Sequence, residues 1–331
     1  MMKVVDMHCD TISAIYLQRK EGQDVSLKQN QLHISLDKMQ KGDYLLQNFA
    51  MFTPLSMTDN PWQYAHDLID TFYQEMNQFS DLIGVVKNYQ DMMDNMKHHR
   101  MSALLTLEEG AVIQGDLKNL QHYYDLGVRM ITLTWNFPNG IGYPNFSMDD
   151  DQHGYHTCDT IHGLTDFGKA YVKECERLGI IIDVSHLSDA GFEDVYQLTT
   201  KPFVASHSNA RSVCPHARNM TDEMILKLAS RGGVMGINYA ADFLCENHQE
   251  HALSKIEDIV KHILYIKKLA GIDCIGLGSD FDGIPPYLEL KDASYLSLLE
   301  KALKQAGLSS LEIEKIFYKN VLRVYQNILK S

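Results

Sequence analysis

Short hydrophobic runs recur along this chain, and longer segments in which apolar residues follow a helical spacing separate them. Within the short runs, apolar residues mostly follow one another directly instead of alternating with polar ones. A parallel strand that is buried on both faces requires such a continuous pattern. We therefore expect eight strands, at residues 3–10, 44–52, 102–110, 128–135, 180–186, 201–208, 232–239 and 274–283.

Helix-capping residues lie between several of these strands, at Thr165 or Asp166, Ser188, Thr221 and Ser309. The helix that begins at residue 165 or 166 ends near Gly179, because glycine commonly follows a helix C-terminus. Ser309 and Glu312 form a capping box for a final amphipathic helix at about residues 309–329, with apolar positions that include Leu311, Ile316, Phe317 and Leu322. The alternation of eight strands with helices predicts a (β/α)8 barrel of the TIM type, and an open doubly wound sheet is the alternative.

Polar residues at the ends of the predicted strands favour the barrel. These residues are His8, Asp10, Glu108, Trp135, His186, His207 and Asp280. Barrel enzymes collect their active-site residues in a ring at the carboxyl ends of the strands, whereas an open sheet would spread them along a crevice. A segment rich in turn formers, at about residues 136–160, is expected to form a long loop over the barrel mouth. We expect a single barrel domain over residues 1–331.

Composition and charge narrow the class of protein. The chain has 331 residues, of which 45% are hydrophobic and 22% charged, so it can bury a large core. The net charge of −13 and the scattered basic residues argue against nucleic-acid binding, which requires clustered Lys and Arg. No apolar run approaches the ~20 residues that cross a bilayer, so we expect no membrane partner.

The six cysteines are far apart in the sequence and form no CxxC pair or zinc-finger spacing. They are Cys9, Cys158, Cys175, Cys214, Cys245 and Cys274. We interpret them as reduced thiols in the core, which indicates a cytoplasmic protein, although a secreted form with a removed leader stays open.

The strand ends at residues 8–10, 108, 186, 207 and 280 supply three histidines and at least three carboxylates. Imidazole and carboxylate together are a good ligand set for Zn²⁺. This set is too large for one catalytic zinc ion with three protein ligands. Two ions about 3.5–4 Å apart that share one carboxylate would use all of these groups.

Five short motifs carry a resemblance to a known family. They are DMHCD at 6–10, LEEG at 107–110, VSHLSD at 184–189, SHSNARSVCPHARN at 206–219 and GLGSDFDG at 276–283. Each motif is weak alone, but together and in this order they resemble the membrane dipeptidase (renal dipeptidase) family of zinc peptidases, family M19. The resemblance extends over nearly the whole chain and implies a barrel of the metallo-dependent hydrolase type.

The resemblance implies two Zn²⁺ ions with five protein ligands, which are His8 and Asp10 for one ion, His186 and His207 for the other, and Glu108 as the bridge between them. Glu108 and Glu109 are adjacent, so in a strand their side chains face opposite ways and only one can enter the site. The family pattern selects Glu108. Glu109 is then a supporting residue outside the ligand set.

The resemblance also implies roles for residues that do not bind metal. Asp280 matches the first Asp of the family's GDFDG pattern and would transfer the proton. Arg218 would bind the free carboxylate of the substrate, for which a planar guanidinium is well suited. Trp135, Tyr239 and Asn219 are the other expected substrate-binding residues. Trp135 departs from the family, because mammalian-type members have a histidine at this position.

The implied function is a zinc-dependent dipeptidase, in which a hydroxide that bridges the two ions attacks the peptide bond of dipeptides. Dipeptides with a D-residue at the C-terminal position are candidate substrates, and the resemblance makes a homodimer plausible. One alternative is another amidohydrolase-type barrel enzyme that acts on a non-peptide amide or a lactone. A second alternative is a metal-binding barrel whose turnover is impaired because Trp135 replaces the family histidine.

Overall fold

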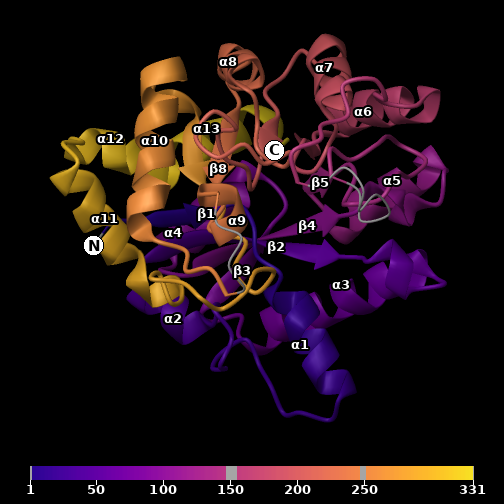
Figure 1. Cartoon of the computed structure of the whole chain (residues 1–331). Coiled ribbons are helices and arrows are strands. Elements are labelled where there is room, and N and C mark those ends of the chain that lie inside the picture. Colours follow the sequence, from indigo (N-terminus) through magenta and orange to yellow (C-terminus); the bar gives the residue numbers. More distant parts are fainter. Residues whose placement is uncertain (1, 147–154, 247–250, 331) are drawn as a thin grey trace.

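Eight parallel strands form a closed barrel in this computed structural model, which describes residues 2–146, 155–246 and 251–330 (Figure 1). The barrel strands are β1 (Val4–Asp6), β2 (Tyr44–Phe52), β4 (Met101–Glu108), β5 (Met130–Thr132), β6 (Ile181–Asp183), β7 (Val204–Ala205), β8 (Val234–Ile237) and β9 (Ile275–Leu277). Neighbours in the ring follow the order β2-β1-β9-β8-β7-β6-β5-β4, and a pairing between β2 and β4 closes it. The predicted barrel is confirmed, and the open sheet is wrong because an open sheet has no such closing pair.

The hydrophobic pattern missed one strand, β3 (Ile83–Val86). It pairs with the first half of β4, from Met101 to Leu104, on the side where the second half of β4 pairs with β5. It is therefore an addition at the outside of the barrel. The strand is apolar but has only four residues, and one of them is Gly84, which has a low propensity for strands.

Helices surround the barrel, as Figure 1 shows. They are α1 (Thr11–Lys20), α2 (Leu36–Lys41), α3 (Pro61–Gln78), α4 (Tyr89–Lys97), α5 (Leu117–Leu126), α6 (Asp166–Leu178), α7 (Asp189–Leu198), α8 (Asp222–Ser230), α9 (Ala241–Leu244), α10 (Ile256–Ala270), α11 (Leu296–Gln305), α12 (Ser310–Glu314) and α13 (Asn320–Ile328). Thr165 is the N-cap of α6, with its side chain accepting the N–H of Gly168. The other predicted caps, at Ser188, Thr221 and Ser309, are also confirmed.

The C-terminal helical segment closes the barrel at the end where the strands begin. A π-helical turn at Lys315–Lys319 joins α12 to α13. Side chains of α13, among them Val321 and Val324, share one core cluster with residues at the strand starts, such as Val204 and Val234. This helical segment was predicted, but its expected apolar position Leu311 is 58% exposed.

Tyr325 connects this C-terminal helical segment to the barrel interior. Its ring is fully buried, and its hydroxyl lies 2.6 Å from Nδ2 and 3.0 Å from Oδ1 of Asn48 on β2. Both polar groups are thereby satisfied inside an apolar cluster, where an unpaired one would cost about 1–3 kcal/mol. The opposite end of the barrel, at the strand carboxyl ends, is left for polar side chains.

Part of the predicted mouth loop lies outside the described residues, namely 147–154. On the described side, Pro144 forms a β-bridge with Leu187, and the N–H of Asn145 donates to the carbonyl of His186 at 2.9 Å. The loop thus leaves β5 and passes directly beside the end of β6.

Candidate metal centre

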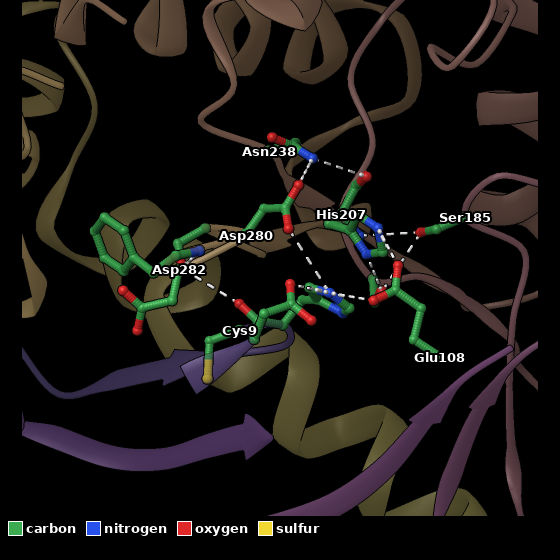
Figure 2. Close-up of polar contacts among 12 residues, drawn as sticks. Cys9, Glu108, Ser185, His207, Asn238, Asp280 and Asp282 are labelled. Carbon is green, nitrogen blue, oxygen red and sulfur yellow. Dashed lines mark hydrogen bonds and ion pairs between the residues drawn. The ribbon is translucent and has the colours of Figure 1, made fainter. Parts of the chain in front are cut away.

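Three histidine side chains from separate strand ends converge on Glu108, the last residue of β4; Figure 2 shows Glu108 beside His207. Its Oε2 lies 3.3 Å from Nε2 of His8, which follows β1. Its Oε1 lies 3.2 Å from Nε2 of His186, which follows β6, and 3.7 Å from Nε2 of His207, which follows β7. The two oxygens of one carboxylate therefore face two different sets of ligand atoms.

The remaining polar groups complete these two sets. Nε2 of His8 lies 3.4 Å from Oδ2 of Asp10 and 3.7 Å from Oδ1 of Asp280. Nε2 of His186 lies 3.0 Å from Nε2 of His207. Such separations suit ligands that share an ion at about 2.0–2.2 Å. Three groups have all their ligand atoms within 4.8 Å of one another, namely His8/Asp10/Glu108, Glu108/His186/His207 and His8/His207/Asp280.

Several of these buried polar atoms have no partner among the described residues, which tests whether a metal fits. Both ring nitrogens of His8 and Oδ1 of Asp10 are buried without a hydrogen bond. Buried groups of this kind are normally paired, because an unpaired one loses the free energy of hydration. A cation between the imidazoles and carboxylates would satisfy them, so the residues present fit a metal centre.

The electrostatics agree with a site for cations. Burial opposes the ionised form of Glu108, but the imidazoles of His8 and His186 outweigh it and hold the pKa of Glu108 well below its usual range. Burial likewise opposes the charged form of His8, yet Glu108 and Asp10 raise its pKa well above the ordinary value. Burial and the charge of Glu108 raise the pKa of Asp10 to about 8. Without a metal ion, the cluster binds protons in its place.

Hydrogen bonds orient the ring of His207. Its Nδ1 donates to Oγ of Ser206 at 2.7 Å, and that hydroxyl donates to Asp183. Oδ2 of Asp183 also accepts a hydrogen bond from Thr132 at 2.6 Å. Ser206 therefore contacts the ring directly, and Asp183 holds the hydroxyl of Ser206. With the proton on Nδ1, the lone pair of Nε2 faces the centre.

The ring of His186 is oriented by Asn136, which sequence reasoning missed. Nδ1 of His186 lies 2.8 Å from Oδ1 of Asn136 in the loop after β5. Its position directly after Trp135, a residue already assigned to the site, was the only available signal. Asp6 does not orient the ring of His8, because it accepts the backbone N–H of His8 at 3.2 Å.

Backbone strain is concentrated at these strand ends. Four non-glycine residues here have positive φ, namely Glu109 (108°), His186 (71°), Asp280 (62°) and Asp282 (69°). Each such conformation costs on the order of 1–3 kcal/mol and persists only where the surroundings enforce it. Unfavourable conformations gathered at one rim are typical of a functional site.

Arg218 is a buried cation without a carboxylate partner among the described residues. Its side chain donates to the carbonyl of His207 at 3.1 Å and to Oγ of Ser208 at 3.4 Å, while Nε has no partner. Burial lowers its pKa to about 10. Asp280 and Glu108 are close enough to act on that pKa, so the guanidinium lies near the metal cluster. An external anion can therefore complete its hydrogen bonds.

The other expected substrate residues lie around the same rim. Trp135 stands 6.3 Å from His186 and 4.8 Å from Phe52, measured between ring centroids. Tyr239 is buried, and its hydroxyl has no hydrogen-bond partner in the described part of the chain. Asn219 donates its amide N–H groups to two backbone carbonyls and keeps only Oδ1 unpartnered. Their contacts with a substrate stay predictions.

Glu109 points away from the ligands and fixes the loop after β5. Its carboxylate accepts the N–H groups of Ala111 (2.9 Å) and Trp135 (3.3 Å) and the amide of Asn139. Burial raises its pKa to about 7. The same loop carries Asn136, so Glu109 supports the metal centre from outside.

Asp282 braces the loop that carries Asp280. Its carboxylate accepts the hydroxyl of Thr11 and the backbone N–H of His33, each at 2.6 Å. Asp280 itself is held by Asn238, whose amide donates to Oδ2 at 2.9 Å (Figure 2).

A family model described as membrane dipeptidase, peptidase family M19, matches residues 1–330. The chain belongs to this family. An uncharacterized protein in the pqqA 5′ region of Klebsiella pneumoniae is 35% identical over 238 residues, which are 71% of this chain and 86% of that protein. An uncharacterized dipeptidase of Schizosaccharomyces pombe is 31% identical over 307 residues, covering 89% of this chain and 72% of its own.

Solved structures share the barrel over its full length. The dipeptidase AC, a metallopeptidase of family M19, has a TM-score of 0.89 at 25% identity and is covered to 99% by 100% of this chain. A metallopeptidase of Rhodobacter sphaeroides, solved with a phosphinate mimic of the dipeptide L-Ala-D-Ala, has a TM-score of 0.90 at 24% identity, with 99% of each chain covered.

As a member of the M19 family, this chain is a metal-dependent dipeptidase by class. The ligand groups described above agree with the metal cofactor of the family. Among the described residues, no helix combines the length and the apolar character needed to cross a bilayer.

Proposed function

We propose that this M19 family member hydrolyses dipeptides with a pair of Zn²⁺ ions. The observation that carries the proposal is the two-sided carboxylate of Glu108, whose Oε2 faces His8 while Oε1 faces His186 and His207. One bridging carboxylate between two ligand sets is the arrangement that a binuclear centre requires.

His8 and Asp10 would hold one ion and His186 and His207 the other, with Glu108 between them. When bound, the two ions would supply a hydroxide near neutral pH from a bridging water and would polarise the peptide carbonyl. The ring orientation needed for ligation already exists, because the side-chain amide oxygen of Asn136 fixes His186 and the hydroxyl of Ser206 fixes His207.

Arg218 restricts the substrate to short peptides with a free C-terminus. Its guanidinium is 5% exposed and has no ion pair among the described side chains, so a substrate carboxylate meets an unneutralised buried cation. Charge-assisted, bidentate hydrogen bonds between guanidinium and carboxylate make such a contact strong and directional. A longer peptide would have an uncharged peptide group at this point and would lose the contact.

Asp280 transfers the proton. Its Oδ1 is free of hydrogen bonds from other described side chains, while Oδ2 is fixed by Asn238. Burial, reinforced by the charge of Glu108, raises its pKa, which makes this carboxylate a better proton acceptor. It can take a proton from the attacking water and deliver it to the leaving amine.

Zinc content and dipeptide hydrolysis test the proposal together. Purified protein should hold about two zinc equivalents and hydrolyse members of a panel that includes L-Ala-L-Ala and L-Ala-D-Ala, the latter because a relative binds its mimic. Chelation should abolish the activity. The adjacent glutamates provide a matched control: Glu108→Gln should lose zinc, whereas Glu109→Gln should retain it.

Three outcomes would contradict the proposal in different ways. Equal zinc content in the two variants would remove Glu108 from the bridging position. A wild type with full zinc and no hydrolysis of any dipeptide would favour the impaired barrel that Trp135 suggests. Hydrolysis of a non-peptide amide or lactone alone would favour the amidohydrolase alternative.

A further inference from the structure

Two histidines on the outer surface of the barrel face each other across neighbouring helices. His66 belongs to α3 and His122 to α5, which lie on the same side of the molecule (Figure 1). Nε2 of His66 lies 2.9 Å from Nε2 of His122. Neither residue belongs to the metal centre described above.

The protonation pattern of His66 is fixed by its helix. Nδ1 of His66 lies 2.8 Å from the carbonyl oxygen of Trp62, which can only accept a hydrogen bond. The ring proton is therefore on Nδ1, and Nε2 carries a lone pair that points at His122. His122 is exposed, so it can hold its own proton on Nδ1 toward water and present a second lone pair.

Aromatic packing holds the two rings in place. The ring of Trp62 stacks on His122, with centroids 5.2 Å apart and an interplanar angle of 22°, and lies 4.5 Å from His66. Tyr123, which is fully buried, contacts both imidazoles from the core side. The pair is thus ordered before any ligand arrives, which reduces the entropy lost on binding.

A similarly close pair of imidazole nitrogens occurs at the metal centre. There the Nε2 atoms of His186 and His207 are 3.0 Å apart, and each Nδ1 is tied to an oxygen. We propose that His66 and His122 form a separate surface site for a divalent transition-metal cation, of which Zn²⁺ is the expected occupant, with water in the remaining coordination positions.

The site differs from the metal centre in strength and consequence. Its two protein ligands are imidazoles near the surface, His122 exposed and His66 half-buried, whereas the metal centre offers buried carboxylates, so the surface ion binds more weakly and exchanges with solvent. Because the ion joins α3 to α5, binding ties together the helices that follow β2 and β4 and stabilises the folded chain.

Equilibrium dialysis of the zinc-loaded enzyme against micromolar Zn²⁺ tests the proposal. The wild type should bind one zinc equivalent more than either His66→Ala or His122→Ala, and added zinc should raise its Tm more than theirs. His98→Ala is the matched control, because Nδ1 of His98 is likewise tied to a carbonyl four residues earlier, Asp94, but no second imidazole faces it within the described residues. This control should bind as much zinc as the wild type.

Dipeptidase activity at saturating zinc should be the same in all four proteins, because none of the substitutions touches the metal centre. Equal zinc content in the wild type and both variants would overturn the proposal and would leave the pair as an ordinary imidazole–imidazole hydrogen bond. The difference in zinc content between the wild type and the variants does not depend on whether the metal centre holds one ion or two. A negative result at this surface site is therefore distinct from a failure of the proposed function.

Discussion

Replacing Arg218 with methionine should make the protein more stable and much less active. Burial lowers the pKa of Arg218 to about 10, which corresponds to a destabilisation of about 3 kcal/mol, since each tenfold change is worth about 1.4 kcal/mol. Methionine, which has a similar length, removes this destabilisation. It also removes two stabilising hydrogen bonds of about 1 kcal/mol each, to His207 and Ser208. The folded state should therefore gain about 1 kcal/mol, or a Tm increase of roughly 1–2 °C for a chain of 331 residues.

This gain in stability should not change with pH below about 10. The pKa of the guanidinium is lower in the folded chain than in the unfolded one, so the destabilisation applies at every pH below about 10. The Tm difference between Arg218→Met and the wild type should hence be the same at weakly acidic and at neutral pH. Thermal melts of the zinc-loaded proteins at several pH values measure it.

Activity should change in the opposite direction. Truncating one partner of a buried charge pair costs about 2–5 kcal/mol, so kcat/KM for a free dipeptide should fall by roughly 30-fold or more in Arg218→Met. The corresponding dipeptide amide has no carboxylate, and its kcat/KM should change little. Equal losses for both substrates would refute the assignment of Arg218 to the substrate carboxylate.

Arg211 provides the control for stability. This arginine is paired with Asp189 through two contacts of 2.7 and 2.8 Å, and its Nε donates to the carbonyl of Asn219. Arg211→Met breaks a pair and leaves a carboxylate without its partner, so its Tm should fall. A fall of similar size in Arg218→Met would show that the latter is also a structural cation.

Three further predictions concern other parts of the molecule. Asn136→Ala should weaken zinc affinity by roughly 10–100-fold in a chelator competition, because His186 loses its orienting acceptor; unchanged affinity would exclude that role. Asp280→Asn should reduce kcat by roughly 10²–10⁴-fold at constant zinc content, since it removes proton transfer, whereas loss of zinc would make Asp280 a ligand. Tyr325→Phe should destabilise the fold by about 1–3 kcal/mol in a denaturant titration, because Asn48 is left unpaired in the barrel interior, and a wild-type midpoint would contradict this.

The barrel and its ligands could be predicted from the sequence because both leave strong local patterns. Strands buried on both faces are continuous hydrophobic runs, and His8, His207 and Asp280 stand just where such runs stop. The strand β3 (Ile83–Val86) was missed although it is apolar, because it has only four residues and contains Gly84. The exposure of Leu311 was missed as well, because apolar spacing alone does not say which neighbours a helix will have.

The supporting residues depend on side-chain direction, which a sequence does not specify. Glu108 and Glu109 are both buried, so hydrophobicity could not separate them; the turn at Glu109, with φ of 108°, sends its carboxylate to Trp135 and away from the ligands. Asn136 acts through one amide oxygen whose position is set by that same loop. Only three-dimensional coordinates reveal such contacts.

The closure of the barrel by α13 matters for any shortened version of the chain. Removing the residues from about 320 onward would expose the inward-facing valines at the start of β7 and β8 to water. It would also leave the buried amide of Asn48 without its hydrogen-bond partner Tyr325. The ligand strands would then lose support at the end remote from the ions, and zinc retention would fail although every ligand is still encoded. Tags and fusion partners are therefore best attached beyond the last turn of this helix, with a spacer that preserves the contact between Tyr325 and Asn48.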